Sequence, residues 1–189
     1  MIEIKNLNKK YGEEVLFEDF NISFYEGEIN VIMGKSGLGK TTLLRIMMGL
    51  EDFEGEILNL PEVANAVFQE ERLVEDLSVY KNISLGFRDK PIEERIMSGL
   101  KHLDIMDKAH FPCRNLSGGM KRRVSVLRAI VPDSDIVYMD EPFEGLDEVN
   151  KNKLIDYILE NKGERTMLIV LHDIDDAKAL GARIFNIDS

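Results

Sequence analysis

The feature that most constrains the fold of this chain is a short apolar stretch that runs directly into a glycine-rich loop. The stretch Ile29–Met33 is largely apolar, which is typical of a strand buried in a parallel sheet. The loop Gly34–Thr41 satisfies the pattern G-x-x-x-x-G-K-[ST], and helix formers with apolar spacing follow over Thr41–Leu50. A strand, a phosphate-cradling loop and a helix in this order predict a site for ATP, because a chance glycine-rich turn would not need both flanking elements.

The residue types of this loop each serve the binding of phosphate groups. Glycines let successive backbone N–H groups surround the phosphates, Lys40 is placed to reach the β- and γ-phosphates, and the Thr41 hydroxyl is placed to hold Mg²⁺. We therefore expect Lys40 to act in catalysis as well as in binding, and Thr41 to be a metal ligand. The residues expected to contact the nucleotide here are Gly34, Lys35, Ser36, Gly37, Gly39, Lys40, Thr41 and Thr42.

The rest of the chain alternates strand patterns with helix patterns. Further strands are expected at Met1–Lys5, Val15–Tyr25, Gly55–Leu58, Val63–Phe68, Asp135–Asp140, Thr166–Leu171 and Arg183–Ile187. Helices are expected over most of Ser78–Leu103, with Pro91 at a helix start, and over Gly118–Ile130, Asp147–Asn161 and Ile174–Leu180. This order predicts an α/β fold with a mainly parallel sheet.

The composition excludes several classes of protein. A formal net charge of −11 argues against a nucleic-acid partner, which would need a basic face. The single cysteine, Cys113, allows no disulfide within the chain, as expected in a reducing cytosol. The N-terminus has no signal-peptide pattern, and no apolar stretch is long enough to span a membrane. We therefore expect a soluble, cytoplasmic chain that can dock onto a membrane protein.

A second candidate element of the nucleotide site follows the strand Asp135–Asp140. Carboxylates at the carboxyl end of a parallel strand face the ligand crevice of such folds. Asp140 is expected to hold Mg²⁺ through water, and Glu141 to polarise the attacking water as general base. On residue types alone, two surface acids in an Asp-Glu-Pro turn would explain the pair equally well. The phosphate loop favours the catalytic interpretation.

Five further motifs resemble those of the ATP-binding-cassette (ABC) family and stand in that family's order. Leu116–Met120 looks like the signature motif, and Glu144–Asp147 looks like the D-loop. Gln69 stands at the position of the Q-loop, His172 follows the strand Thr166–Leu171, and Tyr11 matches the aromatic residue that stacks on adenine. Together with the phosphate loop, the resemblance covers essentially the whole chain.

The resemblance implies one ABC ATPase domain over residues 1–189 with the P-loop NTPase fold. Its expected parts are a mainly parallel sheet, an N-terminal antiparallel β subdomain and an inserted helical subdomain at about residues 72–130. Ser117, Gly118 and Gly119 precede a predicted helix, so their N–H groups would form a second anion site. In the family this site faces a γ-phosphate held by a partner subunit, which implies a head-to-tail dimer of nucleotide-binding subunits, closed with ATP and open after hydrolysis.

The family also implies roles for single side chains. Tyr11 would stack on adenine, and Asp147 would belong to the nucleotide site through the D-loop. Gln69 would ligate Mg²⁺ and pass the nucleotide state to the helical insert, and His172 would contact the γ-phosphate and help to orient Glu141 and water.

Each of these residues has a simpler interpretation that the sequence leaves open. Ser117 is a common type of helix N-cap, and a tyrosine such as Tyr11 often only packs in a sheet or turn. Gln69 has the character of an ordinary solvated side chain, and a single histidine such as His172 is more often a capping or surface residue. The phosphate loop is what favours the functional interpretation of the set.

Two positions depart from the family pattern. The signature motif often ends in glutamine, where this chain has Met120, which should have a modest effect because it follows the phosphate-facing residues. The D-loop begins Glu144-Gly145 where many relatives have Ser-Ala, which affects the details of communication across the dimer.

The resemblance predicts the ATP-hydrolysing subunit of a membrane transporter, peripheral at the inner face of the cell membrane, with the permease on separate chains. Import is favoured over export because Val67–Leu73 looks like the Q-loop region of importers for nitrate, sulfonates and related small anions. Arg72–Tyr80 would help to form the groove for a cytoplasmic helix of the permease, although plain solvent exposure explains that segment nearly as well. No regulatory C-terminal domain is expected after the last strand.

The alternative function is a soluble, non-transport ABC ATPase of DNA repair or translation. The repair type should carry a long coiled coil between the phosphate loop and the signature, and the translation type should carry two cassettes in one chain. This chain has a short insert and one cassette. A third possibility, a nucleotide-binding regulator that does not hydrolyse ATP, is disfavoured by the presence of Lys40, Asp140, Glu141 and His172.

Overall fold

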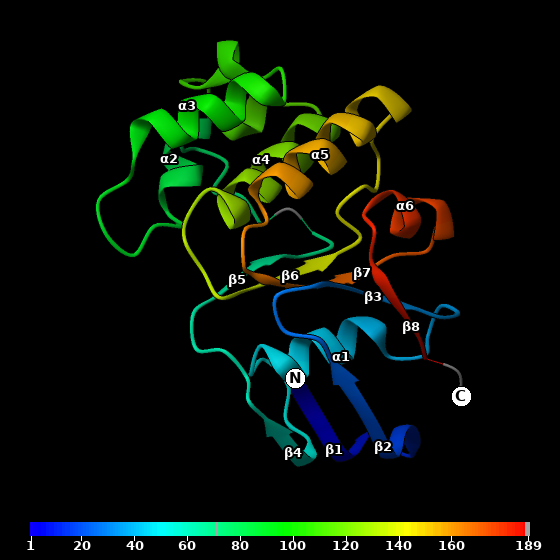
Figure 1. Ribbon diagram of the computed structural model, residues 1–189. Coiled ribbons are helices and arrows are strands. Elements are labelled where there is room, and N and C mark those ends of the chain that lie inside the picture. The colour runs from blue at the N-terminus through cyan, green and yellow to red at the C-terminus, as the bar shows by residue number, and fades with distance from the viewer. Residues whose placement is uncertain (71, 188–189) are drawn as a thin grey trace.

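The apolar strand that leads into the glycine-rich loop lies inside a five-stranded parallel sheet of the computed structural model, which describes residues 1–70 and 72–187 (Figure 1). The strand order is β5-β6-β7-β3-β8, and the paired strands run parallel throughout. Their bounds are β3 Ile29–Met33, β5 Ala64–Val67, β6 Ile136–Asp140, β7 Thr166–Val170 and β8 Arg183–Asn186. Because parallel neighbours align their carboxyl ends, the segments that follow β3, β6 and β7 emerge at one edge of this sheet.

The central strands of this sheet are apolar because they are covered on both faces. Side chains alternate between the faces with period two, so Val137 and Met139 join one core whereas Ile136 and Tyr138 join the other. Each face of the sheet therefore has its own hydrophobic core.

A small antiparallel sheet and one helix form the first core. The small sheet has the order β2-β1-β4, with β1 Ile2–Tyr11, β2 Glu14–Phe24 and β4 Glu54–Leu58. Helix α1 (Lys40–Met47) lies between the two sheets in Figure 1. Its apolar residues pack with those of the small sheet; the buried members include Leu43, Leu44, Ile46, Met47, Ile2, Ile4, Leu7, Phe17 and Phe24.

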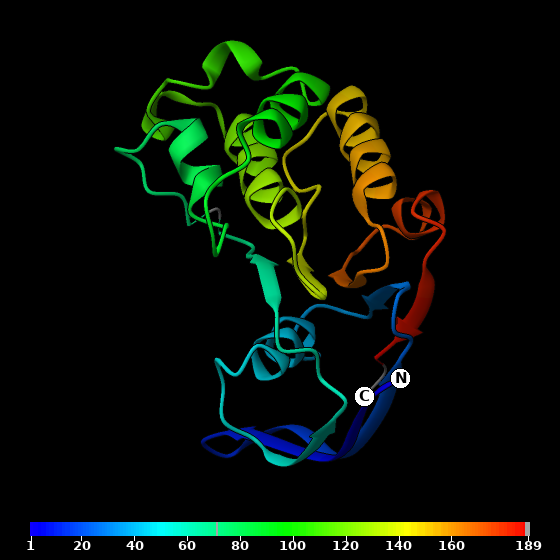
Figure 2. The ribbon, with the colours of Figure 1, turned by 60° about the vertical axis from the view of Figure 1, so that its left-hand side comes forward.

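The second core lies under the remaining helices, which Figures 1 and 2 show on the opposite face of the parallel sheet. These helices are α2 Val79–Ser84, α3 Glu93–His102, α4 Gly118–Ile130, α5 Glu148–Asn161 and α6 Ile174–Ala179. Two 3₁₀ turns, Met106–Lys108 and Cys113–Asn115, connect α3 to α4. The apolar side of α4 is almost completely buried, so this helix forms the centre of the helical part.

The predicted α/β class with a mainly parallel sheet and an N-terminal antiparallel part is confirmed. One predicted element is longer than expected. The first strand continues beyond Lys5 to Tyr11, because it pairs with β2 along most of its length through several register shifts. The predicted helical stretch Ser78–Leu103 contains two helices, α2 and α3, which agrees with the helix start expected at Pro91. The chain leaves the helix after Ser84, where a Cβ on Gly86 would lie 2.3 Å from the Arg128 carbonyl oxygen of α4, and α3 begins shortly after Pro91.

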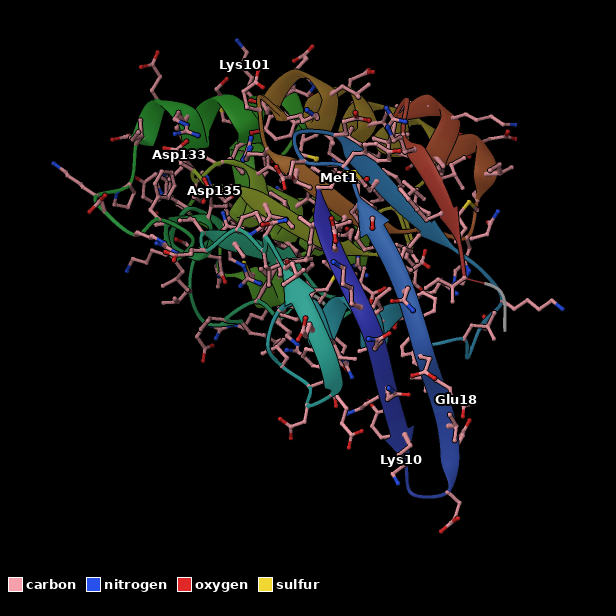
Figure 3. All side chains as sticks on the ribbon, turned by 60° about the horizontal axis from the view of Figure 1, so that its bottom comes forward. Met1, Lys10, Glu18, Lys101, Asp133 and Asp135 are labelled. Atoms are coloured by element: carbon pink, nitrogen blue, oxygen red, sulfur yellow. The ribbon has the colours of Figure 1, made fainter. Side chains whose placement is uncertain are left out.

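Figure 3 shows the hairpin of β1 and β2 from the side of the small sheet, with Met1 at one end and Lys10 and Glu18 toward its turn. Asp133 and Asp135 lie just before β6, at the opposite end of that strand from Asp140. Across the described ranges, no helix has both the length and the apolar character needed to cross a membrane.

Candidate nucleotide site

A cleft of about 440 Å³ opens at the carboxyl edge of the parallel sheet, between that edge and the hairpin of the small sheet. It gathers residues that are far apart in the sequence, because the segments after β3, β5, β6 and β7 all reach this edge. The cleft is lined by Tyr11, Glu14, Leu16, Ser36, Gly37, Gly39, Lys40, Thr41, Thr42, Gln69, Asp140, Glu141, Val170 and His172. Most of the predicted nucleotide, metal and catalytic residues therefore lie together. A hollow of similar size on the small sheet, lined by residues such as Lys10 and Glu18, contains none of them.

The glycines of the loop adopt backbone conformations that other residues rarely reach. Gly37 and Gly39 have φ values of +88° and +87°, in the left-handed region that favours glycine. A Cβ on Gly39 would lie 2.7 Å from the Phe17 ring, whereas a Cβ on Gly37 would meet no atom within 4 Å. Gly34 has φ +151°, and a Cβ there would lie 2.5 Å from the Ile187 carbonyl oxygen. The loop can therefore pack against β2 and the chain after β8 only with glycines at positions 34 and 39.

Helix α1 begins at Lys40, within the last two residues of the loop motif, and its first N–H groups lack a side-chain cap in the described structure. The first N–H groups of a helix have no partner within the helix, and the helix dipole favours an anion at this end. This end of α1 is therefore suited to bind phosphate groups.

The Lys40 side chain is buried and closes the loop on itself. Its ammonium group donates to the carbonyl oxygens of Gly34 and Lys35 at 2.8 and 2.9 Å. An ammonium group has three donors, so a third remains for a ligand oxygen in the cleft. Two fixed hydrogen bonds hold the positive charge where the loop would hold a phosphate.

The donor set beside the loop suits a hard cation such as Mg²⁺. Asp140 is buried, its Oδ1 atom has no hydrogen-bond partner among the described residues, and the Thr41 hydroxyl hydrogen-bonds to the carboxyl group. Burial raises the pKa of Asp140, and the Thr41 hydrogen bond and the nearby charges of Arg45, Lys40 and Arg122 lower that pKa. A buried carboxylate with an unpaired oxygen beside a hydroxyl provides oxygen ligands, which Mg²⁺ prefers.

The described part of the chain has no cluster of three or more histidine, cysteine or carboxylate ligands. Mg²⁺ in phosphate-transfer sites is usually held by one or two carboxylates together with substrate phosphates rather than by an all-protein cage. Three residues fit that kind of site, namely Thr41, Asp140 and Gln69. All three also line a small cavity beside the cleft.

Glu141 is poised for proton transfer. Burial is the main cause that raises the pKa of Glu141 to about 7, followed by the negative charge of Asp140; Lys40 opposes this rise. The Nε2 atom of His172 lies 3.0 Å from Glu141 Oε1, close enough to pair but not aligned as a hydrogen bond. Glu141 also has φ +49°, an uncommon conformation for a residue with a side chain, of the kind that clusters at functional sites. A carboxylate with a pKa near the working pH is well suited to act as a general base.

The Ser117 loop lies outside the cleft. Ser117 caps α4 by accepting a hydrogen bond from the Met120 N–H at 3.3 Å, and both Ser117 and Gly118 are exposed. The simple capping interpretation therefore describes the geometry correctly, and it leaves the loop accessible to a ligand from outside this subunit. A Cβ on Gly119 would lie 3.3 Å from the Leu146 side chain, so the signature loop packs against the D-loop.

Asp147 also lies outside the cleft and caps a helix. Its carboxylate accepts from the N–H and the side-chain amide of Asn150, both at 2.8 Å, at the start of α5. A direct nucleotide contact of Asp147 within its own subunit does not fit this arrangement. Asp147 instead fixes the end of the D-loop, next to Leu146, which packs against Gly119.

Tyr11 stands at the mouth of the cleft, at the end of β1, with 47% of its surface exposed. The Lys9 ammonium group lies 4.7 Å from the centre of its ring. A tyrosine that only completed the core would be buried, so this position leaves ring surface available for stacking.

The sequence reasoning missed Arg122, which holds the backbone at Gln69. Arg122 lies on α4 and is buried, and its guanidinium donates to the carbonyl oxygens of Phe68 and Gln69 at 2.8 and 2.5 Å. In the sequence it stands in the run Lys121-Arg122-Arg123, and no sequence pattern there distinguishes an arginine that will be buried from one that will be exposed to solvent. Only its position five residues after Ser117 could have drawn attention to it.

Comparisons with known proteins show which family this chain resembles. A family model described as ABC transporter matches residues 17–144. The aliphatic sulfonates import ATP-binding protein SsuB 1 of Paracoccus denitrificans is 33% identical over 187 residues, which cover 97% of this chain and 77% of that protein. An uncharacterized ABC transporter ATP-binding protein of Haemophilus influenzae is 34% identical, covering 98% of this chain and 81% of that protein. A solved dimeric ATP-binding cassette in a post-hydrolysis state with ADP and Pi matches with a TM-score of 0.85 and 28% identity, covering 98% of this chain and 94% of that chain.

The loop geometry predicts different costs for two glycine substitutions. Gly37→Ala adds only the strain of a positive φ, on the order of 1 kcal/mol, whereas Gly39→Ala adds a clash with Phe17 and should lower the free energy of unfolding by about 1–3 kcal/mol more. Urea unfolding without nucleotide measures both variants. Equal losses in the two variants would contradict the packing assigned to Gly39.

Proposed function

This chain belongs to the ABC transporter family and is one of its ATP-hydrolysing subunits, and on that premise we propose that it drives the import of a small organic anion through separate membrane subunits. The observation that carries the proposal is the cleft in which the phosphate loop, Asp140, Glu141 and His172 meet. Such a site converts ATP binding and hydrolysis into movement only if it communicates with partner chains. The proposal therefore concerns the nucleotide chemistry, the second nucleotide-binding subunit and the permease in turn.

The nucleotide is bound by backbone groups and a few side chains. The loop from Gly34 to Thr42 and the start of α1 surround the phosphates, and Tyr11 stacks on adenine. Thr41, Asp140 and Gln69 would hold Mg²⁺, which would neutralise charge on the nucleotide phosphates. Lys40 reaches the same phosphates from a side chain that is already fixed by two carbonyl groups.

Hydrolysis is assigned to Glu141 with His172 as its partner. Glu141 accepts a proton from a water molecule as that water attacks the γ-phosphorus, and the bond to the β-phosphate oxygen breaks to give ADP and phosphate. His172, 3.0 Å from Glu141, orients that carboxylate and contacts the γ-phosphate. Lys40 stabilises the negative charge that develops on the phosphate oxygens.

A second copy or a similar chain completes the site. The exposed loop of Ser117, Gly118 and Gly119 lies away from the subunit's own cleft and would bind the γ-phosphate held by its partner. Dimeric ATP-binding cassettes among the similar solved structures support this arrangement. ATP then joins two subunits, and its hydrolysis separates them.

The proposal of a permease partner and of import rests on the names of similar proteins. Several similar proteins are named aliphatic sulfonates import ATP-binding proteins, which supports import and a small sulfonate-like anion as the transported class. The subunit would lie at the cytoplasmic face of the membrane. Its docking groove would include Arg72–Tyr80, where Val74 is an exposed apolar side chain. Part of the importer-like stretch Val67–Leu73, at position 71, lies outside the described residues.

The alternative is a soluble ABC ATPase that serves DNA repair or translation. The connection between α1 and α4 is built of short strands and helices, with no long coiled coil in the described ranges. This observation favours the transporter subunit over a repair ATPase.

Replacing the proposed general base separates binding from hydrolysis. Glu141→Gln removes the proton acceptor but keeps the shape of the side chain, so turnover should fall by about 10²–10⁴-fold while ATP binding stays intact. Steady-state phosphate release and equilibrium binding of a fluorescent ATP analogue measure the two properties. Unchanged turnover would remove Glu141 from the mechanism.

Ser117→Arg tests the shared site. A bulky cation in the exposed loop should block ATP-driven dimerisation in a Glu141→Gln background while monomers still bind ATP. Size-exclusion chromatography with and without ATP measures the association. Ser78→Ala, which loses the equivalent cap of α2, controls for the loss of a helix cap. Dimers that still form with ATP would refute the sandwich arrangement.

Isolation of the partners tests the transport role. The tagged chain, purified from native membranes in mild detergent, should retain a multi-span membrane protein, identified by mass spectrometry. The Lys40→Ala variant controls for the need for nucleotide during assembly. Recovery of only ribosomes or DNA would refute the transporter assignment in favour of the soluble alternative.

A further inference from the structure

The segment that carries Gln69 is attached to helix α4 by two arginine side chains. Arg122 donates to the carbonyl oxygens of Phe68 and Gln69, and Arg128, six residues further along the helix, donates to the Arg72 carbonyl oxygen at 2.9 Å. All three acceptors are backbone atoms, so the attachment holds the backbone at Phe68, Gln69 and Arg72 rather than one side chain. The same helix begins at Ser117, whose side chain caps it.

Arg122 is the stronger of the two attachments. Its side chain is only 4% exposed, and a buried guanidinium is costly unless its donors are used. It has two short charge-assisted hydrogen bonds to carbonyl oxygens, whereas its Nε atom has no partner in the described part of the chain. The planar fork of arginine matches two neighbouring carbonyl groups, which a lysine ammonium group would not.

A third segment meets the same guanidinium. The carboxylate of Glu144, in the D-loop, lies 3.8 Å from an Arg122 Nη atom. Glu144 is more than half exposed, so the pair contributes little energy, but it brings the start of the D-loop to the same point. Glu144 is one of the residues at which this chain departs from the usual family pattern. Arg122 therefore contacts the Gln69 segment and the D-loop from the helix that carries Ser117.

We propose that Arg122 is a positioning residue that makes Gln69 and the Ser117 loop move as one unit. The inference rests on the proposed function, in which Gln69 contacts the nucleotide of its own subunit and Ser117 contacts that of the partner. If nucleotide displaces the backbone at Gln69, either α4 follows it or both hydrogen bonds of Arg122 break. Arg122 thereby transmits the state of one nucleotide site to the loop that completes the other.

A double-mutant cycle tests whether Arg122 acts through Gln69. Steady-state ATP hydrolysis is measured for the purified chain, Arg122→Gln, Gln69→Ala and the double variant. Arg122→Gln should lower kcat about tenfold, the effect of losing a hydrogen bond from a charged donor, and change KM less than about twofold. The double variant should be no slower than the slower single variant, because both substitutions disrupt one unit. Two effects that multiply, or an unchanged kcat in either single variant, would overturn the proposal.

Two further variants separate positioning from general loss of charge or structure. Lys121→Gln removes a positive charge from the neighbouring position, where Lys121 pairs with Glu75 at 3.1 Å, and should leave kcat unchanged. An equal loss of kcat in Lys121→Gln would overturn the proposal. If Arg122→Gln does not fold in a thermal melt, Arg122→Lys, which keeps the buried charge without the planar fork, takes its place in the cycle with the same criteria.

The outcome also distinguishes this proposal from the function on which it rests. A chain that does not hydrolyse ATP would refute the proposed function. A chain that hydrolyses ATP and needs Gln69, but whose Arg122 effect is independent of Gln69, would refute the coupling alone.

Discussion

The hydrogen-bonded register of three parallel strands decides where every reacting group of this protein lies. β7 pairs with β6 on one side and β3 on the other, and Val170 lies opposite both Asp140 and Ile32. The chain leaves each strand within a few residues of this row. The glycine-rich loop, the carboxylates Asp140 and Glu141, and His172 therefore meet at one edge. A shift of the register by one residue would turn every side chain of the strand to the opposite face.

Burial at this edge of the parallel sheet changes the pKa values of the site's carboxyl groups. The strand that ends at Asp140 is covered on both faces, so Asp140 and Glu141 lie at the boundary of two cores and lose part of their hydration. The pKa of Glu141 rises to about 7 chiefly for this reason. Lys40 is buried in the same place, and two backbone carbonyl groups compensate its charge. The fold thus holds the Glu141 carboxyl group and the Lys40 ammonium group close together before any ligand arrives. This preorganisation is what electrostatic catalysis needs.

The helical part is joined to this edge through the backbone rather than through side-chain packing alone. Arg122 and Arg128 attach the Gln69 segment to α4, and the D-loop packs against Gly119 near the start of the same helix. The two arginine contacts are hydrogen bonds to carbonyl oxygens, and they supplement the continuous apolar core that joins the helices to the parallel sheet.

The sequence by itself determined the elements whose signals are local. The glycine-rich loop needs particular residue types at a fixed spacing, and the apolar strands and capped helices follow from periodicity, so Gly34–Thr41, β6 and α4 could all be predicted. The helix start near Pro91 also follows from a local signal, whereas the end of α2 before Gly86 does not, because Gly86 lies against the Arg128 carbonyl oxygen of α4.

Tertiary structure alone decided which polar residues are buried and what they touch. Arg122 looks like a surface residue in the sequence, but it is buried and holds the Gln69 backbone from a helix more than fifty residues away along the chain. The physical reason is that local conformation depends on neighbours in sequence, whereas burial and hydrogen bonding of a side chain depend on segments that the fold brings from far away.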